Sequence, residues 1–115
     1  DTGSIYNMAA MANPAAEIHI CEGEFDSMIL EQCGWPAVAL PGATSWQNFW
    51  TKFFEGYDHI YIWSDPDKAG DQMAQTLQTA LPQATHVPLT LGDVTDTYLQ
   101  AGKTGLTQAL NTVLQ

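Results

Sequence analysis

Short apolar runs alternate along the chain with segments in which apolar residues recur every three or four positions. The runs have the length and composition of buried strands and lie at 19–21, 37–40, 59–63 and 86–89. The other segments have the spacing of amphipathic helices and cover 25–33, 46–55, 69–81 and 106–114. This alternation predicts an α/β fold with a central, four-stranded, mainly parallel sheet and helices on both faces.

Acidic residues follow two of the predicted strands directly. Glu22 comes immediately after the first strand, and Asp65 and Asp67 follow the third strand after a single serine. In a sheet with the strand order 2-1-3-4, the first and third strands would be neighbours about 4.8 Å apart. Ligands of such sheets bind outside the carboxyl ends of the strands, where the strand order reverses. We therefore expect these three carboxylates to converge at that edge.

Converging carboxylates repel one another and need a compensating charge. At about 4 Å and an effective dielectric constant near 20, each like-charged pair costs roughly 4 kcal/mol. Oxygen-only ligands favour Mg²⁺ or Mn²⁺ over Zn²⁺. The alternative is that Asp65 or Asp67 caps the helix that begins near Lys68. Asp93 and Asp96, after the fourth strand, could reach the same edge or form a turn with an N-cap at Asp93.

The composition limits how the chain could act on nucleic acids. Its 115 residues suit one domain, and 13 acids against three lysines and no arginine give a formal net charge of −10. Most of such a surface repels a polyanion, so binding would have to use a metal ion or another domain. Two cysteines without a metal-ligand pattern indicate buried free thiols. The absence of a signal peptide or membrane span predicts a cytoplasmic protein without a membrane partner.

Three motifs resemble those of the Toprim domain, in particular its primase branch in phage and plasmid primases and primase-helicases. They are Glu22-Gly23-Glu24-Phe25-Asp26, which matches EGxxD, Asp65-Pro66-Asp67-Lys68-Ala69-Gly70, which matches DxDxAG, and Gly92-Asp93, which resembles a later GxD motif. Each motif follows a predicted strand, and the resemblance extends from about Tyr6 to Gly102. It implies a Rossmann-like Toprim fold with a catalytic domain at 17–115. Residues 1–16 are expected to lead in from a preceding segment of a longer protein.

The resemblance also implies an activity and a set of site residues. The activity is template-directed synthesis of RNA primers by metal-dependent nucleotidyl transfer. Glu22, Asp65 and Asp67 would be catalytic and would hold Mg²⁺ or Mn²⁺, with Asp26 and Asp93 as further metal ligands. The partners would be a single-stranded DNA template and nucleoside triphosphates, bound mainly by domains outside this fragment. A replicative helicase is a further candidate partner, and the isolated fragment could be inactive.

Several positions have two interpretations. Gly23, Gly42 and Lys68 are the expected substrate-binding positions. Gly42 could instead form an ordinary turn, and Lys68 could instead pair with a surface acid. The aromatic residues at 46, 49, 50 and 53 fall on one helical stripe and are expected in the core rather than stacked on bases.

Two other functions remain compatible with the same motifs. Toprim domains also occur in topoisomerases and nucleases, where the acids assist strand cleavage, and a non-catalytic interaction module could keep the fold.

Overall fold

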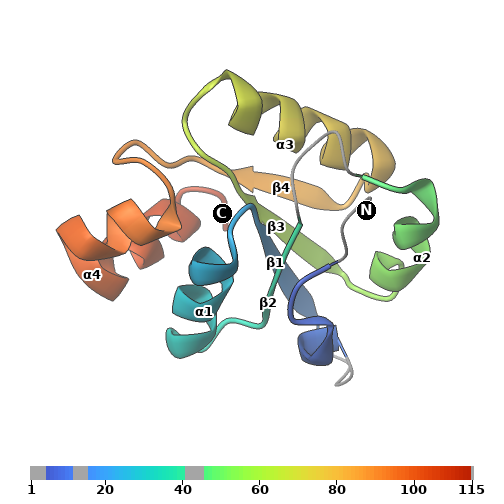
Figure 1. The fold of residues 1–115 in the computed structure, drawn as a ribbon, viewed down its shortest axis with the longest axis horizontal. Coiled ribbons are helices and arrows are strands. Elements are labelled where there is room, and N and C mark those ends of the chain that lie inside the picture. The colour runs from blue at the N-terminus through green and yellow to red at the C-terminus, as the bar shows by residue number, and fades with distance from the viewer. Residues whose placement is uncertain (1–4, 12–15, 41–45, 115) are drawn as a thin grey trace.

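The computed structural model describes residues 5–11, 16–40 and 46–114, which form a layered α/β domain (Figure 1). Its strands are β1 (Glu17–Cys21), β2 (Ala37–Ala39), β3 (His59–Trp63) and β4 (Ala84–Val87). Its α-helices are α1 (Glu24–Gln32), α2 (Thr51–Phe54), α3 (Lys68–Ala80) and α4 (Val94–Asn111), and its 3₁₀ turns are η1 (Met8–Met11) and η3 (Asn48–Trp50).

The four strands form a parallel sheet in the order β2-β1-β3-β4, which confirms the predicted topology. Successive strand residues point to opposite faces, so each strand contributes to two cores. Helices α2 and α3 cover one face, where Ile20 and Ile62 are fully buried, and α1 and α4 cover the other, where Cys21 and Trp63 are buried. Because all strands are parallel, they end at the same edge of the sheet, and α1, α3 and α4 begin shortly after β1, β3 and β4 end there.

Most elements differ from their predicted bounds by a few residues, and the differences at β4 and α4 have a clear physical cause. Strand β4 ends at Val87 rather than 89 because Pro88 has no N–H to donate to the ladder. Helix α4 begins at Val94 rather than 106, after an N-cap at Asp93. Gly102 interrupts the helical geometry of α4 with a backbone φ of 63°, so the apolar residues before and after it do not follow one continuous helical spacing.

The predicted aromatic stripe is only partly correct. Trp50 is buried in the core and Trp46 packs against it partly buried, but Phe49 and Phe53 are 57% and 40% exposed. The 3₁₀ turn η3 leads into the single-turn helix α2, and this break in helical geometry turns positions 49 and 53 outward.

Part of the lead-in before residue 17 packs on this domain. Ile5 is buried in the core, and Tyr6 exchanges two backbone hydrogen bonds with Ala39 on the outer edge of β2 (2.8 and 3.1 Å). Both cysteines are buried and free, as predicted. None of the helices in the described part of the chain is both long and apolar enough to cross a membrane.

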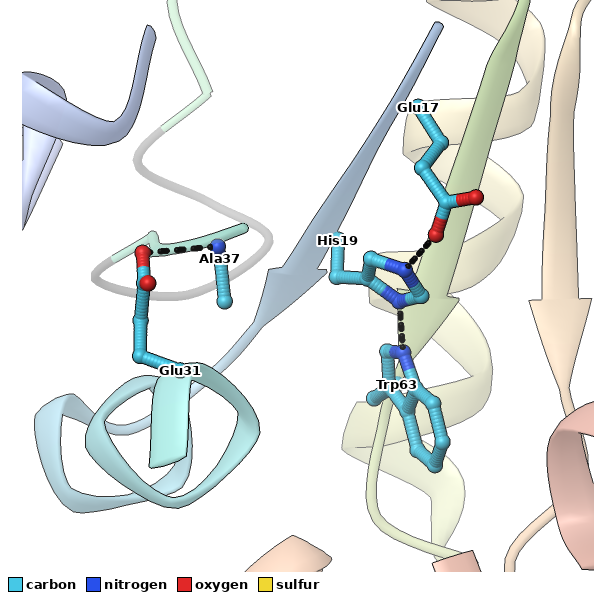
Figure 2. A network of polar contacts seen from close by, with 5 residues as sticks. All are labelled: Glu17, His19, Glu31, Ala37 and Trp63. Carbon is cyan, nitrogen blue, oxygen red and sulfur yellow. Dashed lines mark hydrogen bonds and ion pairs between the residues drawn. The ribbon is translucent and has the colours of Figure 1, made fainter. Parts of the chain in front are cut away.

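A fully buried histidine, His19, links β1 to β3 on the face of the sheet that α1 and α4 cover (Figure 2). The indole N–H of Trp63 donates to Nδ1 of His19 (2.8 Å), and Nε2 of His19 lies 2.6 Å from a carboxylate oxygen of Glu17. Because Nδ1 accepts, the neutral ring carries its proton on Nε2 and donates it to Glu17. Burial lowers the pKa of His19, although its hydrogen bond to Glu17 and the charge of Glu17 oppose that shift.

This histidine predicts a pH-dependent contribution to stability. The unfolded chain protonates His19 below about pH 6.5, whereas the native chain resists protonation to a lower pH. The stability from neutral His19 is therefore present above pH 6.5 and is lost as the pH falls toward the lowered pKa. His19→Phe keeps the ring but leaves the Trp63 N–H without an acceptor, which should cost about 1–3 kcal/mol near pH 8.

Urea unfolding between about pH 8 and pH 5 would measure the stability difference between wild type and His19→Phe. The difference should shrink as the pH falls, and a constant difference would contradict the assignment. His59→Phe, which removes an exposed histidine from the adjacent strand, is the matched control.

Candidate metal centre

Three carboxylates from distant parts of the chain meet at the carboxyl edge of the sheet. Asp26 lies in the first turn of α1, Asp65 follows β3, and Asp93 is the N-cap of α4. One carboxylate oxygen from each lies within 4.8 Å of the others. Asp26 is buried, and the other two are partly buried. This arrangement is an oxygen-only cluster, which we call the acidic cluster (Asp26, Asp65 and Asp93).

Asp26 is fixed in this cluster by the first turn of α4. Its Oδ1 accepts hydrogen bonds from both the backbone N–H of Thr95 (3.0 Å) and the Thr95 hydroxyl (2.6 Å). These bonds tie the start of α1 to the start of α4. No pattern in the sequence indicates the role of Thr95, because the contact joins residues 69 positions apart.

Glu22 lies beside the cluster, as its place after β1 predicts. The paired residues of β1 and β3 end with Cys21 and Trp63, and Oε2 of Glu22 then accepts a hydrogen bond from the backbone N–H of Asp65 (2.7 Å). Glu22 and Asp65 therefore converge across neighbouring strands. The catalytic role of Glu22 stays a prediction.

Asp67 caps α3, the alternative that its position after β3 left open. Its Oδ1 accepts a hydrogen bond from the backbone N–H of Gly70 (2.7 Å), and its side chain is exposed. Asp67 is not one of the three residues of the acidic cluster, although its charge acts on Asp65. At Gly70 a Cβ atom would overlap the carbonyl oxygen of Asp65, so only glycine lets α3 begin this close to the acidic turn.

Asp93 combines the two interpretations proposed for it. Its Oδ1 accepts a hydrogen bond from the N–H of Asp96 (2.7 Å), and Asp96 accepts from the N–H of Asp93 (3.2 Å), which forms a capping box. Gly92 precedes it with a backbone φ of 111°, a conformation that favours glycine. The same Asp93 side chain also places an oxygen in the acidic cluster.

The three expected substrate-binding positions have different surroundings. Gly23 is the N-cap of α1, and a Cβ added there would lie 3.4 Å from Oδ2 of Asp26, so the backbone passes close to the cluster. Lys68 begins α3 with an exposed side chain and forms no ion pair with any acid in the described ranges. Gly42 lies outside the described residues.

Burial and neighbouring negative charges raise the pKa values of Asp65 and Asp93. Burial is the largest cause of the rise in the pKa of Asp65 to about 7, followed by the charges of Glu22, Asp93, Asp67 and Asp26. Burial also raises the pKa of Asp93, with smaller contributions from Asp26 and Asp96, against the backbone hydrogen bond from Asp96.

No protein cation offsets this repulsion in the described part of the chain, where the only ion pair within 4 Å joins Glu17 to His19. A pair of charges 4.8 Å apart repels by about 3 kcal/mol at an effective dielectric constant near 20. Three convergent carboxylate oxygens are the donor set that Mg²⁺ or Mn²⁺ prefers, so the residues present fit such an ion.

Comparison with known proteins identifies a matching family and a relative from a phage. A family model described as Toprim-like matches residues 19–96. The chain is 32% identical over 111 residues to the Gene 57 protein of Mycobacterium phage D29, a match that covers 96% of this chain and 73% of that protein.

Solved structures share the fold. The primase fragment of the bacteriophage T7 primase-helicase superposes with a TM-score of 0.75 at 22% identity, covering 85% of this chain and 44% of that chain. Primase domains bound to an RNA/DNA hybrid and dTTP, in a complex with the T7 lagging-strand DNA polymerase, give a TM-score of 0.70 at 23% identity, covering 81% and 52%. A small Toprim protein from Bacillus stearothermophilus gives 0.60 at 20% identity, covering 85% and 88%. The chain thus spans about half the length of the two T7 chains.

The raised pKa of Asp65 predicts that the metal-free chain loses stability as the pH rises. The native state keeps a proton on Asp65 up to about pH 7, whereas the unfolded chain loses it near 3.8, so the loss occurs between these values. Asp65→Asn removes this repulsion and should stabilise the chain near pH 8 by about 1 kcal/mol, a value reduced because solvent screens a partly exposed group.

Urea unfolding in the presence of a chelator, from about pH 4 to pH 8, would test this prediction. The advantage of Asp65→Asn should disappear at the acid end of the range. The control is Asp58→Asn, the same substitution at an exposed position just before β3 rather than just after it. A metal-free Asp65→Asn chain less stable than wild type near pH 8 would contradict the electrostatic account.

Proposed function

This chain belongs to the Toprim-like family, and we propose that it is the nucleotidyl-transfer domain of a DNA primase, which makes RNA primers on a single-stranded template. The observation that carries the proposal is the acidic cluster at the switch point between β1 and β3. Its oxygens come from all three motifs that resemble the primase branch, namely Asp26, Asp65 and Asp93.

In this proposal the three clustered carboxylates would hold Mg²⁺ or Mn²⁺. The ion, when bound, would supply Lewis-acid stabilisation of phosphate oxygens and lower the pKa of an attacking hydroxyl. Asp65 would give up its proton on binding, because its pKa of about 7 reflects burial and repulsion by neighbouring acids, and a bound cation would favour the charged carboxylate against both.

The neighbouring acids have complementary tasks in the proposal. Glu22 orients the Asp65 backbone through one carboxylate oxygen, and its other oxygen makes no hydrogen bond to a described residue. Asp67 likewise holds the start of α3 through one oxygen. Both carboxylates therefore add negative charge at the rim, where they would act as ligands or as a general base toward the primer hydroxyl.

The partners in the proposal follow from charge. With three lysines and a formal net charge of −10, the chain offers little to hold a template or a triphosphate by itself. We propose that domains outside this chain bind the DNA and the nucleotides, with Lys68 and the backbone at Gly23 as the local substrate contacts. A replicative helicase as partner and action in the cytoplasm complete the proposal.

The first test is metal binding by the chain itself. Isothermal titration with Mn²⁺ should show binding that Asp65→Asn weakens by about 10-fold or more, because one of three convergent oxygens loses its charge. Asp58→Asn should bind as wild type does. No Mn²⁺ binding by wild type, or equal binding by Asp65→Asn, would remove the basis of the proposal.

The second test is the activity of the full-length protein from which the chain derives. RNA primer synthesis from nucleoside triphosphates on single-stranded template should fall by about 100-fold or more in Asp65→Asn and stay unchanged in Asp58→Asn. Nicking of supercoiled plasmid without primer synthesis would indicate the strand-cleavage chemistry instead. Full primer yield from Glu22→Gln together with Asp65→Asn would indicate a non-catalytic module.

A further inference from the structure

A buried serine lies between the end of β3 and the acidic cluster. Ser64 follows Trp63, precedes Asp65 and is 1% exposed. Its hydroxyl oxygen lies 2.7 Å from Nε2 of His86, which projects from β4. Neither residue belongs to the three motifs, and this hydrogen bond joins the outermost strand of the sheet to the residue that precedes Asp65.

Backbone hydrogen bonds between β3 and β4 do not extend to Ser64 or Asp65. The pairing of β3 with β4 ends at Trp63 and Val87, and the next residue of β4 is Pro88, which has no N–H to continue it. On the other side of β3, the pairing with β1 ends at Cys21 and Trp63.

Beyond Trp63, side chains replace the ladder on both sides of β3. Directly after β1, Glu22 accepts a hydrogen bond from the N–H of Asp65 (2.7 Å), and on β4, His86 forms a hydrogen bond with the hydroxyl of Ser64. The turn that carries Asp65 is therefore held between one side chain from each neighbouring strand.

We propose that His86 is a positioning residue for the Asp65 carboxylate. Through Ser64 it holds the start of the acidic turn against β4, so that the Asp65 oxygen stays within reach of Asp26 and Asp93. The proposal rests on the proposed function only in that the acidic cluster binds a divalent cation.

The chemistry of metal sites gives the expected size of the effect. Ligand atoms must lie within about 0.2 Å of their ideal distances, so a small shift of the turn would weaken binding. Side chains that orient ligands without touching the metal typically change its affinity by about 10–100-fold. His86 is half-buried and remote enough in sequence that only the fold brings it to Ser64.

The test uses Mn²⁺ as the probe and four variants of the chain. His86→Phe keeps the ring and removes its nitrogens, Ser64→Ala removes the hydroxyl from the other side, and the double variant removes both. His86→Gln keeps a hydrogen-bonding group near the position of Nε2. Titration calorimetry gives the affinity of each variant, and thermal unfolding reports its stability. His59→Phe, at an exposed position on β3, is the control.

His86→Phe and Ser64→Ala should each weaken Mn²⁺ binding by about 10-fold. The double variant should lose no more than either single variant, because both remove the same bond. His86→Gln should restore the affinity to within about 3-fold of wild type. A purely structural role would lower the unfolding temperature without this pattern of affinities, so rescue and non-additivity separate the two.

Wild-type affinity in His86→Phe would overturn the inference, as would losses that add in the double variant. If His86→Phe does not fold, the Mn²⁺ affinity of Ser64→Ala tests the inference, because this variant removes the same hydrogen bond by the loss of a single oxygen atom. The Asp65→Asn variant separates this inference from the proposed function. Weaker binding in Asp65→Asn with unchanged binding in Ser64→Ala rejects the positioning role alone, whereas unchanged binding in both rejects the metal site as well.

Discussion

Repulsion among carboxylates at one edge of the sheet is the constraint on which the rest of the structure depends. Asp26, Asp65 and Asp93 bring oxygens within 4.8 Å of one another, and no lysine in the described ranges comes within 4 Å of any acid. A parallel sheet makes this possible because its strand ends and the following helix starts lie together. The positive ends of α1, α3 and α4 offset part of the charge, but each supplies only about half a unit within its first turn.

The chain holds its acids in place with backbone donors rather than with opposite charges. Thr95 fixes Asp26, the N–H of Asp65 engages Glu22, and Asp67 and Asp93 cap the helices that follow them. Each of these bonds fixes a carboxylate in position and leaves its negative charge available. A site built in this way is ordered before any cation arrives, so binding need not spend free energy on arranging ligands.

Much of this arrangement was predictable from the sequence, and the parts that were not predictable have physical causes. The apolar runs predicted the parallel sheet. With the strand order 2-1-3-4, the acids after the first and third strands predicted the convergence of Glu22 with Asp65, because the carboxyl ends of neighbouring parallel strands lie side by side. Spacing does not give side-chain direction, so it left open whether Asp67 would cap α3 or join the metal site. The resemblance offered Asp26 and Asp93 only as further ligands beside Glu22, Asp65 and Asp67. Thr95 and His86 act across the fold on residues far away in sequence, and a local pattern carries no record of such contacts.

The same charge that defines the site also constrains how a substrate could reach it. A chain with a formal net charge of −10 repels phosphates over most of its surface, and its cluster repels them most strongly when no cation is bound. If the cluster holds a divalent ion, phosphate and ion each favour the binding of the other, because the ion neutralises both groups. Affinity for nucleotide would then depend on the ion rather than on lysines. In the proposed function, that dependence would separate the task of this domain, which is to place the ion, from template binding by a more basic domain.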